Sequence, residues 1–331
     1  MLMALNAYFT IVLLAIVLFF VVWGLGWLLE RISTRALKTT RDIGSRAWKF
    51  LVGPGVALHE SSHALGCLFT GTEIVEFKPL DVQVTDDGIV LGYVRHRAPS
   101  SPIKGAIIGL APVAVSLVLL VFFALGATYL VPDTPGIGGE ALKLLSDLIN
   151  LKSDPVLLND PVYPIVRIFS FVYLFLYTFA GLTVVNPLFW IVAFLAMTIM
   201  FSNSPSDVDI ANASQGLKII LVFDLVWLVV AYFLPVAGWA LYGLFELIAV
   251  MWALSLAFAV VGLGLFILIA GLSRIRVPFN IIPLIACIAT GAALMLWGIG
   301  TPAFQTVVSL GVFVAFTIPL LVACGSPERT I

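Results

Sequence analysis

Two of the chain's three histidines lie four residues apart, in the sequence His-Glu-Ser-Ser-His at positions 59–63. On a helix, residues i and i+4 share one face, with Cβ atoms roughly 6 Å apart. The imidazoles of His59 and His63 could therefore each give one nitrogen to the same Zn²⁺, at about 2.0–2.1 Å. Glu60 projects about 100° around the helix from His59, close enough to take a proton from a water molecule as a general base. The motif predicts a metal-dependent hydrolase with His59 and His63 as ligands and Glu60 as the catalytic residue.

The apolar setting of this motif bears on whether it arose by chance. The pattern His-Glu-x-x-His fixes only three positions, and in soluble sequences it often occurs without a metal. Here it lies within LVGPGVALHESSHALGCLF, in a chain with 11% charged residues. Burying an unpaired carboxylate is costly, and ionisable residues inside a membrane are functional by default. Metal binding is therefore our interpretation, and a purely structural polar cluster is the alternative.

The composition is that of a multi-pass membrane protein. Of the 331 residues, 61% are hydrophobic, and the mean hydropathy is +1.13. A soluble protein of this size cannot hide so much apolar surface, so we expect an integral protein of the cell membrane, in contact with the lipid bilayer. The net charge of −1 argues against a nucleic-acid partner. The three cysteines lie far apart in apolar sequence, which indicates buried thiols, although Cys67, one turn after His63, is an alternative ligand.

Apolar segments long enough to cross a membrane recur along the chain. They cover residues 7–29, 50–70, 103–131, 162–185, 187–202, 216–234, 238–271, 279–299 and 303–323. The segment 187–202 is short, and Asn186-Pro187 before it could either kink or end a helix. We therefore predict an all-α polytopic membrane protein with eight or nine transmembrane helices. Residues 1–49 form an N-terminal transmembrane helix and a basic interfacial segment, residues 50–215 form a core with the metal motif, and residues 216–331 form a C-terminal helical bundle.

The polar stretch after the motif has the pattern of a β-hairpin. Two apolar runs, IVEFKPL and IVLGYVRH, are separated by DVQVTDDG, in which Asp87-Gly88 is a turn signal. One interpretation is that a free strand edge pairs with an unwound peptide and presents its scissile bond to the metal. An ordinary loop outside the membrane is the alternative. A second polar stretch, residues 132–161, is predicted to be a loop with one short helix near 139–150.

A catalytic zinc site needs a third protein ligand. The remaining histidine, His96, stands between two arginines, so we interpret it as a surface or substrate-contact residue. The sequence Ser-Pro-Ser-Asp at 204–207 has the form of a helix N-terminus, which gives Asp207 a structural role. Asp209 has no such explanation and is our first choice for the third ligand. Asp207 and Glu246, which is alone in the apolar run LYGLFELIAVMW, remain alternatives.

The segment ALHESSHALGCLFTGTE, residues 57–73, resembles the first motif of the site-2 proteases, which are intramembrane zinc metalloproteases. The predicted hairpin resembles the re-entrant β-loop of that family, and Gly109-Leu-Ala-Pro112 resembles its small-residue patch. The family's second motif contains Leu-Asp-Gly, whereas this chain has Ser-Pro-Ser-Asp-Val-Asp-Ile. That spacing is closer to a divergent branch of zincin membrane peptidases with a Ser-x-x-Asp-hydrophobic element, onto which Ser206 and Asp209 align. The resemblance covers residues 50–215 and implies a metalloprotease core with Zn²⁺ as cofactor.

These observations predict a zinc metallopeptidase that cleaves membrane proteins or peptides within or beside the bilayer. One alternative is an enzyme similar to the membrane zinc proteases that trim prenylated proteins, with a glutamate as the third ligand. Another is a membrane protein that binds metal for transport or sensing without catalysis. Desaturases and hydroxylases are excluded because they need more than three histidines.

Overall fold

The computed structural model describes residues 7–38, 52–81, 83–85, 88–129, 136–186, 188–203, 207–275 and 278–323. Most of these residues are helical, because inside a membrane each backbone N–H and C=O must be bonded within its own segment. The α-helices are α1 (Ala7–Lys38), α3 (Gly53–Thr70), α4 (Pro102–Thr128), α5 (Gly136–Asn150), α6 (Pro155–Leu158), α7 (Tyr163–Val185), α8 (Leu188–Ser202), α9 (Asp207–Phe233), α10 (Pro235–Arg274), α11 (Ile282–Leu296) and α12 (Pro302–Ala323). Two 3-10 turns, η1 (Leu151–Ser153) and η2 (Phe279–Ile281), precede α6 and α11.

Seven of the described helices are long and apolar enough to cross a membrane, so the chain is a multi-pass integral membrane protein. They are α1, α4, α7, α9, α10, α11 taken together with the η2 turn before it (Phe279–Leu296, 18 residues), and α12. The prediction of eight or nine was too high for two physical reasons. Helix α8 has 15 residues, which span about 22 Å, less than the roughly 30 Å of a bilayer core. Helix α3 has 18 residues, but Pro54 and the polar side chains of the metal motif lower its hydropathy.

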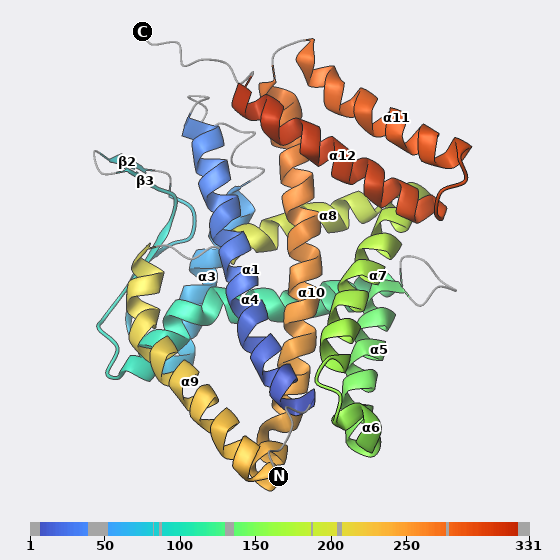
Figure 1. Ribbon diagram of the computed structural model, residues 1–331. Helices are drawn as coiled ribbons and strands as arrows, with labels where there is room; N and C mark the ends of the chain where they lie inside the picture. The colour runs from blue at the N-terminus through green and yellow to red at the C-terminus, as the bar shows by residue number, and fades with distance from the viewer. Residues whose placement is uncertain are drawn as a thin grey trace.

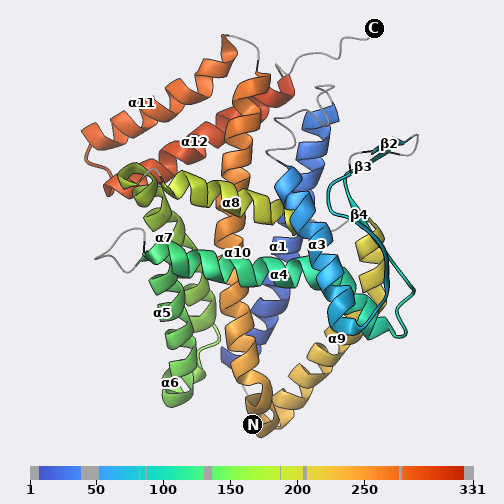
Figure 2. The same cartoon turned by 180° about the vertical axis from the view of Figure 1, so that it is seen from behind.

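Helix α10 forms the centre of the molecule. In Figure 1, and from behind in Figure 2, α10 runs through the middle of the bundle, and α4 and α8 cross it. Helix α1 packs along α10, while α5 and α7 pack against it on another side. Helices α11 and α12 pair at one end, and α9 leans away from the bundle on the side of the β-strands. The central position of α10 explains why Tyr242, Ala253 and Phe258 are among its fully buried residues.

Helix α7 ends at Val185 and helix α8 begins at Leu188, so these are two helices and not one kinked helix. Asn186 has an extended backbone, with φ −135° and ψ 112°, as expected for a residue that precedes proline. Its side-chain oxygen accepts a hydrogen bond of 3.0 Å from the backbone N–H of Leu188, which caps the start of α8. Because the two helices are separate, α8 can run across α10 (Figure 2). Its last residue, Ser202, thereby reaches His59 of α3.

The predicted hairpin after the metal motif is present. Strand β1 (Ile74–Lys78) pairs antiparallel with β4 (Tyr93–His96), and β2 (Gln83–Thr85) pairs antiparallel with β3 (Gly88–Val90). The turn expected at Asp87-Gly88 lies partly outside the described residues, since 86 and 87 are not described. Strands β1 and β4 pack against α3, which places the hairpin beside the metal motif.

Two further expectations can be compared with the structure. The short helix predicted near 139–150 is α5, which begins slightly earlier, at Gly136. The apolar segment predicted to span at 7–29 is confirmed with the same bounds, and helix α1 continues beyond it to Lys38. The rest of the basic interfacial segment lies outside the described residues.

Candidate metal centre

Helix α3 carries both histidines, and its own sequence fixes its two ends. Pro54 stands in the first turn, where its missing N–H costs no hydrogen bond. Gly71 ends the helix in the left-handed region, at φ 68°, and its N–H bonds the carbonyls of Cys67 and Leu68. The helix between these ends is unbroken, so its two histidines lie one turn apart on one face.

Glycines let the neighbouring helices come close to this face. A Cβ placed on Gly55 of α3 would lie 2.5 Å from the Cβ of Phe201 on α8, and one on Gly109 of α4 would lie 2.9 Å from the Cβ of Ala213 on α9. Ordinary contacts between carbon atoms are about 3.5–4.0 Å. Only glycine therefore allows these approaches. They bring the end of α8 and the first turns of α9 to the histidine face.

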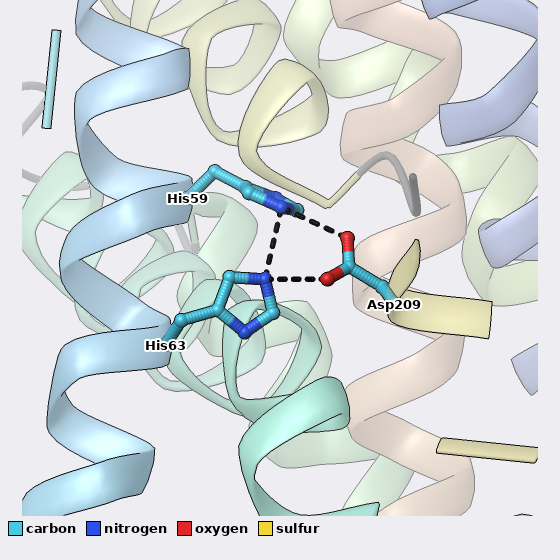
Figure 3. A group of neighbouring side chains, drawn as sticks. All are labelled: His59, His63 and Asp209. Atoms are coloured by element: carbon cyan, nitrogen blue, oxygen red, sulfur yellow. Dashed lines mark hydrogen bonds and ion pairs between the residues drawn. The ribbon is translucent and has the colours of Figure 1, made fainter. Parts of the chain in front are cut away.

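Three side chains meet where α3 and α9 approach each other (Figure 3). Nε2 of His59 lies 3.1 Å from Oδ2 of Asp209, and Nε2 of His63 lies 3.0 Å from Oδ1 of the same carboxylate. The two Nε2 atoms are 3.0 Å apart. Asp209 is 8% exposed and His63 is 7% exposed, so bulk water screens this group little. His59, His63 and Asp209 thus form a group that can hold a metal ion.

The other ring nitrogens show which atoms face the centre of the group. Nδ1 of His59 lies 2.7 Å from the backbone carbonyl of Ser202, and Nδ1 of His63 lies 2.8 Å from that of Ile108. A carbonyl oxygen can only accept, so each Nδ1 must donate its proton to it. In a neutral imidazole the lone pair then lies on Nε2. Such backbone partners orient the imidazoles of metal sites in the same way.

Three acceptors therefore converge with no hydrogen between them when both rings are neutral. Two imidazole lone pairs and a carboxylate at 3.0–3.1 Å repel one another. A cation in their midst converts this repulsion into attraction, and a divalent ion can satisfy all three ligands at once. In a tetrahedral site with bonds of about 2.0–2.1 Å, adjacent ligand atoms are about 3.3 Å apart. The group would have to open by only about 0.3 Å to reach that separation.

Glu60 lies next to this group and under the hairpin. It interacts electrostatically with His59, His63 and Asp209, although it is not one of the three converging residues. Gly92, between β3 and β4, lies beside it: a Cβ added there would lie 3.0 Å from Cγ of Glu60. The same Cβ would lie 2.7 Å from the carbonyl oxygen of Pro79. The position of Glu60 is therefore set partly by the hairpin.

The other candidate third ligands lie elsewhere or outside the described side chains. Asp207 is the first residue of α9, but its side chain, and the expected cap at 204–206, are outside the described part of the chain. Glu246 is buried in α10 at 2% exposure. Phe266 of the same helix packs against Phe201, next to the Ser202 carbonyl. Glu246 precedes Phe266 by twenty residues, about 30 Å along the helix, so it does not reach the histidines.

Two further sequence candidates do not join the group of described residues that could hold a metal. Cys67 is a fully buried free thiol, as its apolar surroundings predict. His96 lies on β4 and directs Nδ1 to the carbonyl of Arg97 at 2.8 Å.

Sequence reasoning missed the groups that position the histidines. The carbonyls of Ser202 and Ile108 belong to the backbone, so no residue type identifies them. Gly92 could have been suspected only from the presence of a glycine within an otherwise strand-like run.

No family model, no curated protein and no solved structure matches this chain. The functional proposal therefore rests on the chemistry of the site.

Proposed function

We propose that this chain is a zinc-dependent endopeptidase that hydrolyses peptide bonds of membrane proteins within or beside the bilayer. The observation that carries the proposal is the convergence of His59, His63 and Asp209 next to Glu60 in an integral membrane protein. Two imidazoles and one carboxylate are a ligand set of catalytic zinc sites, and three protein ligands leave one position for water or substrate.

The chain's own residues supply the remaining chemistry. A zinc ion in this site would polarise a peptide carbonyl and lower the pKa of a water molecule toward 7. Glu60 is placed to accept the proton of the attacking water and to deliver it to the leaving amine. Asp209 adds negative charge to the ligand set, and the Ser202 and Ile108 carbonyls keep both imidazoles in the orientation that binding needs.

The hairpin supports a peptide as the substrate. Strands β1 and β4 form a two-stranded sheet, so each strand leaves one edge unpaired among the described residues. An unwound substrate segment could add to such an edge as a further strand. Because Gly92 of the hairpin lies beside Glu60, where an added Cβ would be 3.0 Å from its Cγ, a peptide bound there would lie near the base.

Of the rival functions, the enzyme with a glutamate as third ligand loses support from the position of Glu246, about 30 Å along α10 from the level of Ser202. A metal-binding protein without catalysis would give Glu60 no role beside the histidines. A non-catalytic metal-binding function is one possible outcome of the test below.

The test is to purify the wild type and Glu60→Gln in detergent, load both with zinc, and incubate them with a library of transmembrane peptides. We expect both proteins to bind one zinc per chain, and cleavage by Glu60→Gln to fall by about 10²–10⁴-fold, the usual contribution of a general base. Glu73→Gln is the matched control, since Glu73 is exposed and pairs with Arg97. Equal cleavage by the wild type and Glu60→Gln would refute the mechanism. Zinc binding without cleavage by the wild type would identify a non-catalytic protein.

A further inference from the structure

Helix α9, which supplies Asp209, carries a second aspartate in the middle of its membrane span. The span covers Ala213–Phe233, so Asp224 is eleven residues from its start and nine from its end. At 1.5 Å per residue, Asp224 lies about 14–17 Å from either end, close to the centre of a bilayer core of roughly 30 Å. Lipid headgroups do not reach this depth. An ionisable residue there is by default functional, and its partner has to be identified.

The burial pattern shows which side of α9 bears Asp224. Ala213, Gly216 and Leu228 are buried, and Asp224 falls on the same helical line, where it is partly buried. The residues on either side of it are exposed, with Phe223 at 52% and Leu225 at 44%. Asp224 therefore lies on the side of α9 that faces the rest of the molecule, not on the side that faces lipid.

Helix α9 is one of the less buried spans of the bundle. Only 11% of the most apolar window of α9 is buried, against 56% for α10. Helix α9 packs closely on α4 near its start, where a Cβ on Gly216 would collide with Ala106. It joins α10 at Leu234, and between these two ends it leans away from the centre in both views (Figures 1 and 2). In the middle of its inward side, Leu221, Asp224 and Trp227 are only partly buried, so the described residues do not cover this stretch completely.

Two polar groups on this side lack partners among the described residues. Asp224 forms no hydrogen bond or ion pair there. Trp227, one turn further on, has an indole N–H that is shielded from solvent and donates to no described acceptor. A carboxylate next to a tryptophan matches a basic side chain, because the carboxylate supplies the opposite charge and the indole ring supplies a cation–π contact.

We propose that the inward side of α9 around Asp224 and Trp227 binds a transmembrane segment of the substrate that carries a lysine or arginine near its middle. Mid-membrane depth favours this occupant, because a cation reaches such a position only when an apolar helix carries it. Asp224 follows Asp209 by fifteen residues, about 22 Å along α9. A substrate helix lying on α9 would thus extend from the basic contact toward the metal centre. That the bound helix is a substrate rests on the proposed peptidase function, whereas the binding of a basic transmembrane helix to α9 does not.

The test measures binding in a protein that cannot cleave. Glu60→Gln is reconstituted in nanodiscs, and the probes are synthetic Leu/Ala helices of about 20 residues with either lysine or methionine at the centre. Affinity is measured by fluorescence transfer to a dye on the protein. We expect the lysine helix to bind about tenfold more tightly than the methionine helix, the usual scale of a polar contact between helices in a membrane. Asp224→Asn should abolish the difference and leave the affinity for the methionine helix unchanged.

Charge reversal separates a specific contact from a general effect on folding. Asp224→Lys should bind a helix with a central glutamate more tightly than one with a central lysine. The proposal is overturned if lysine and methionine helices bind the parent protein equally, or if Asp224→Asn keeps the difference. Because no cleavage is measured, a chain that proves not to be a peptidase can still give either result.

Discussion

The approach of α4 to α9 predicts that one added methyl group at Gly109 disrupts metal binding. A Cβ at Gly109 would lie 2.9 Å from the Cβ of Ala213 and 3.3 Å from the carbonyl oxygen of Asp209. Restoring an ordinary carbon contact of about 3.5 Å requires a separation of about 0.6 Å between the helices. Metal sites tolerate errors of only about 0.2 Å in ligand distance. Because Ala213 is one turn from Asp209, the carboxylate should move with the helix and leave the histidines.

For Gly109→Ala we expect the zinc affinity to fall by about 10–100-fold, the range seen when groups that orient a metal ligand are lost. The measurement is competition with a chromophoric chelator in detergent. The matched control is Gly126→Ala on the same helix α4, because a Cβ at Gly126 meets nothing within 4 Å. This control should bind zinc like the wild type.

The size of the effect should follow the size of the side chain. Gly109→Val should bind zinc more weakly than Gly109→Ala, while both keep the helical circular dichroism and the elution volume of the wild type. The reasoning is refuted if Gly109→Ala binds zinc with wild-type affinity, because Asp209 would then not depend on this contact. If Gly126→Ala is impaired equally, the loss reflects α4 in general and not the approach to α9.

Three further predictions concern the base, the metal and the hairpin. Gly92→Ala should press on Glu60 and lower the cleavage rate at least about tenfold, while zinc stoichiometry, measured by atomic absorption, stays at the wild-type value. Zinc at about 100 times its Kd should raise the unfolding free energy of the wild type by about 2.7 kcal/mol, and thermal melts of His63→Ala should show no such gain. The Tyr93 hydroxyl donates a hydrogen bond to Glu76 and, with nearby cations, holds the pKa of that carboxyl below its usual range. The ionised Glu76 therefore stabilises the hairpin at any pH above the usual carboxyl pKa, and this stabilisation is lost as the pH falls through the lowered pKa. Tyr93→Phe should therefore raise the pKa and make the hairpin open to proteolysis at a higher pH than in the wild type, and identical pH profiles would contradict this.

Much of the fold follows from local sequence because membrane helices must satisfy their own backbone. The apolar runs located α1, α4, α7, α9, α10, α11 and α12 to within a few residues at most ends, and the turn signal located the hairpin. Hydropathy alone overestimated the number of spans. It could not show that α8 is too short, since Asn186-Pro187 permits either a kink or a break. It also could not show how the helices cross, because crossing depends on the shapes of both surfaces.

In the candidate site, too, local features could be predicted from the sequence and contacts between helices could not. The motif spacing predicted the common face of His59 and His63, because i and i+4 coincide on any helix. Asp209 was preferred to Glu246 because the helix cap at 204–207 gave Asp209 no structural role and because Asp209 aligns with the second motif of the zincin membrane peptidases. The structure places Asp209, and not Glu246, at the histidines.

The sequence by itself determined a multi-pass helical protein with two imidazoles and a carboxylate on one short helix, since helical periodicity and hydropathy are local properties. The tertiary structure alone decided that an aspartate 150 residues from His59 meets both rings, and that the Ser202 and Ile108 carbonyls orient them. Those contacts join α3, α4, α8 and α9, and they depend on how closely glycines let these helices approach. No single segment encodes such a distance, because it is a property of two packed surfaces.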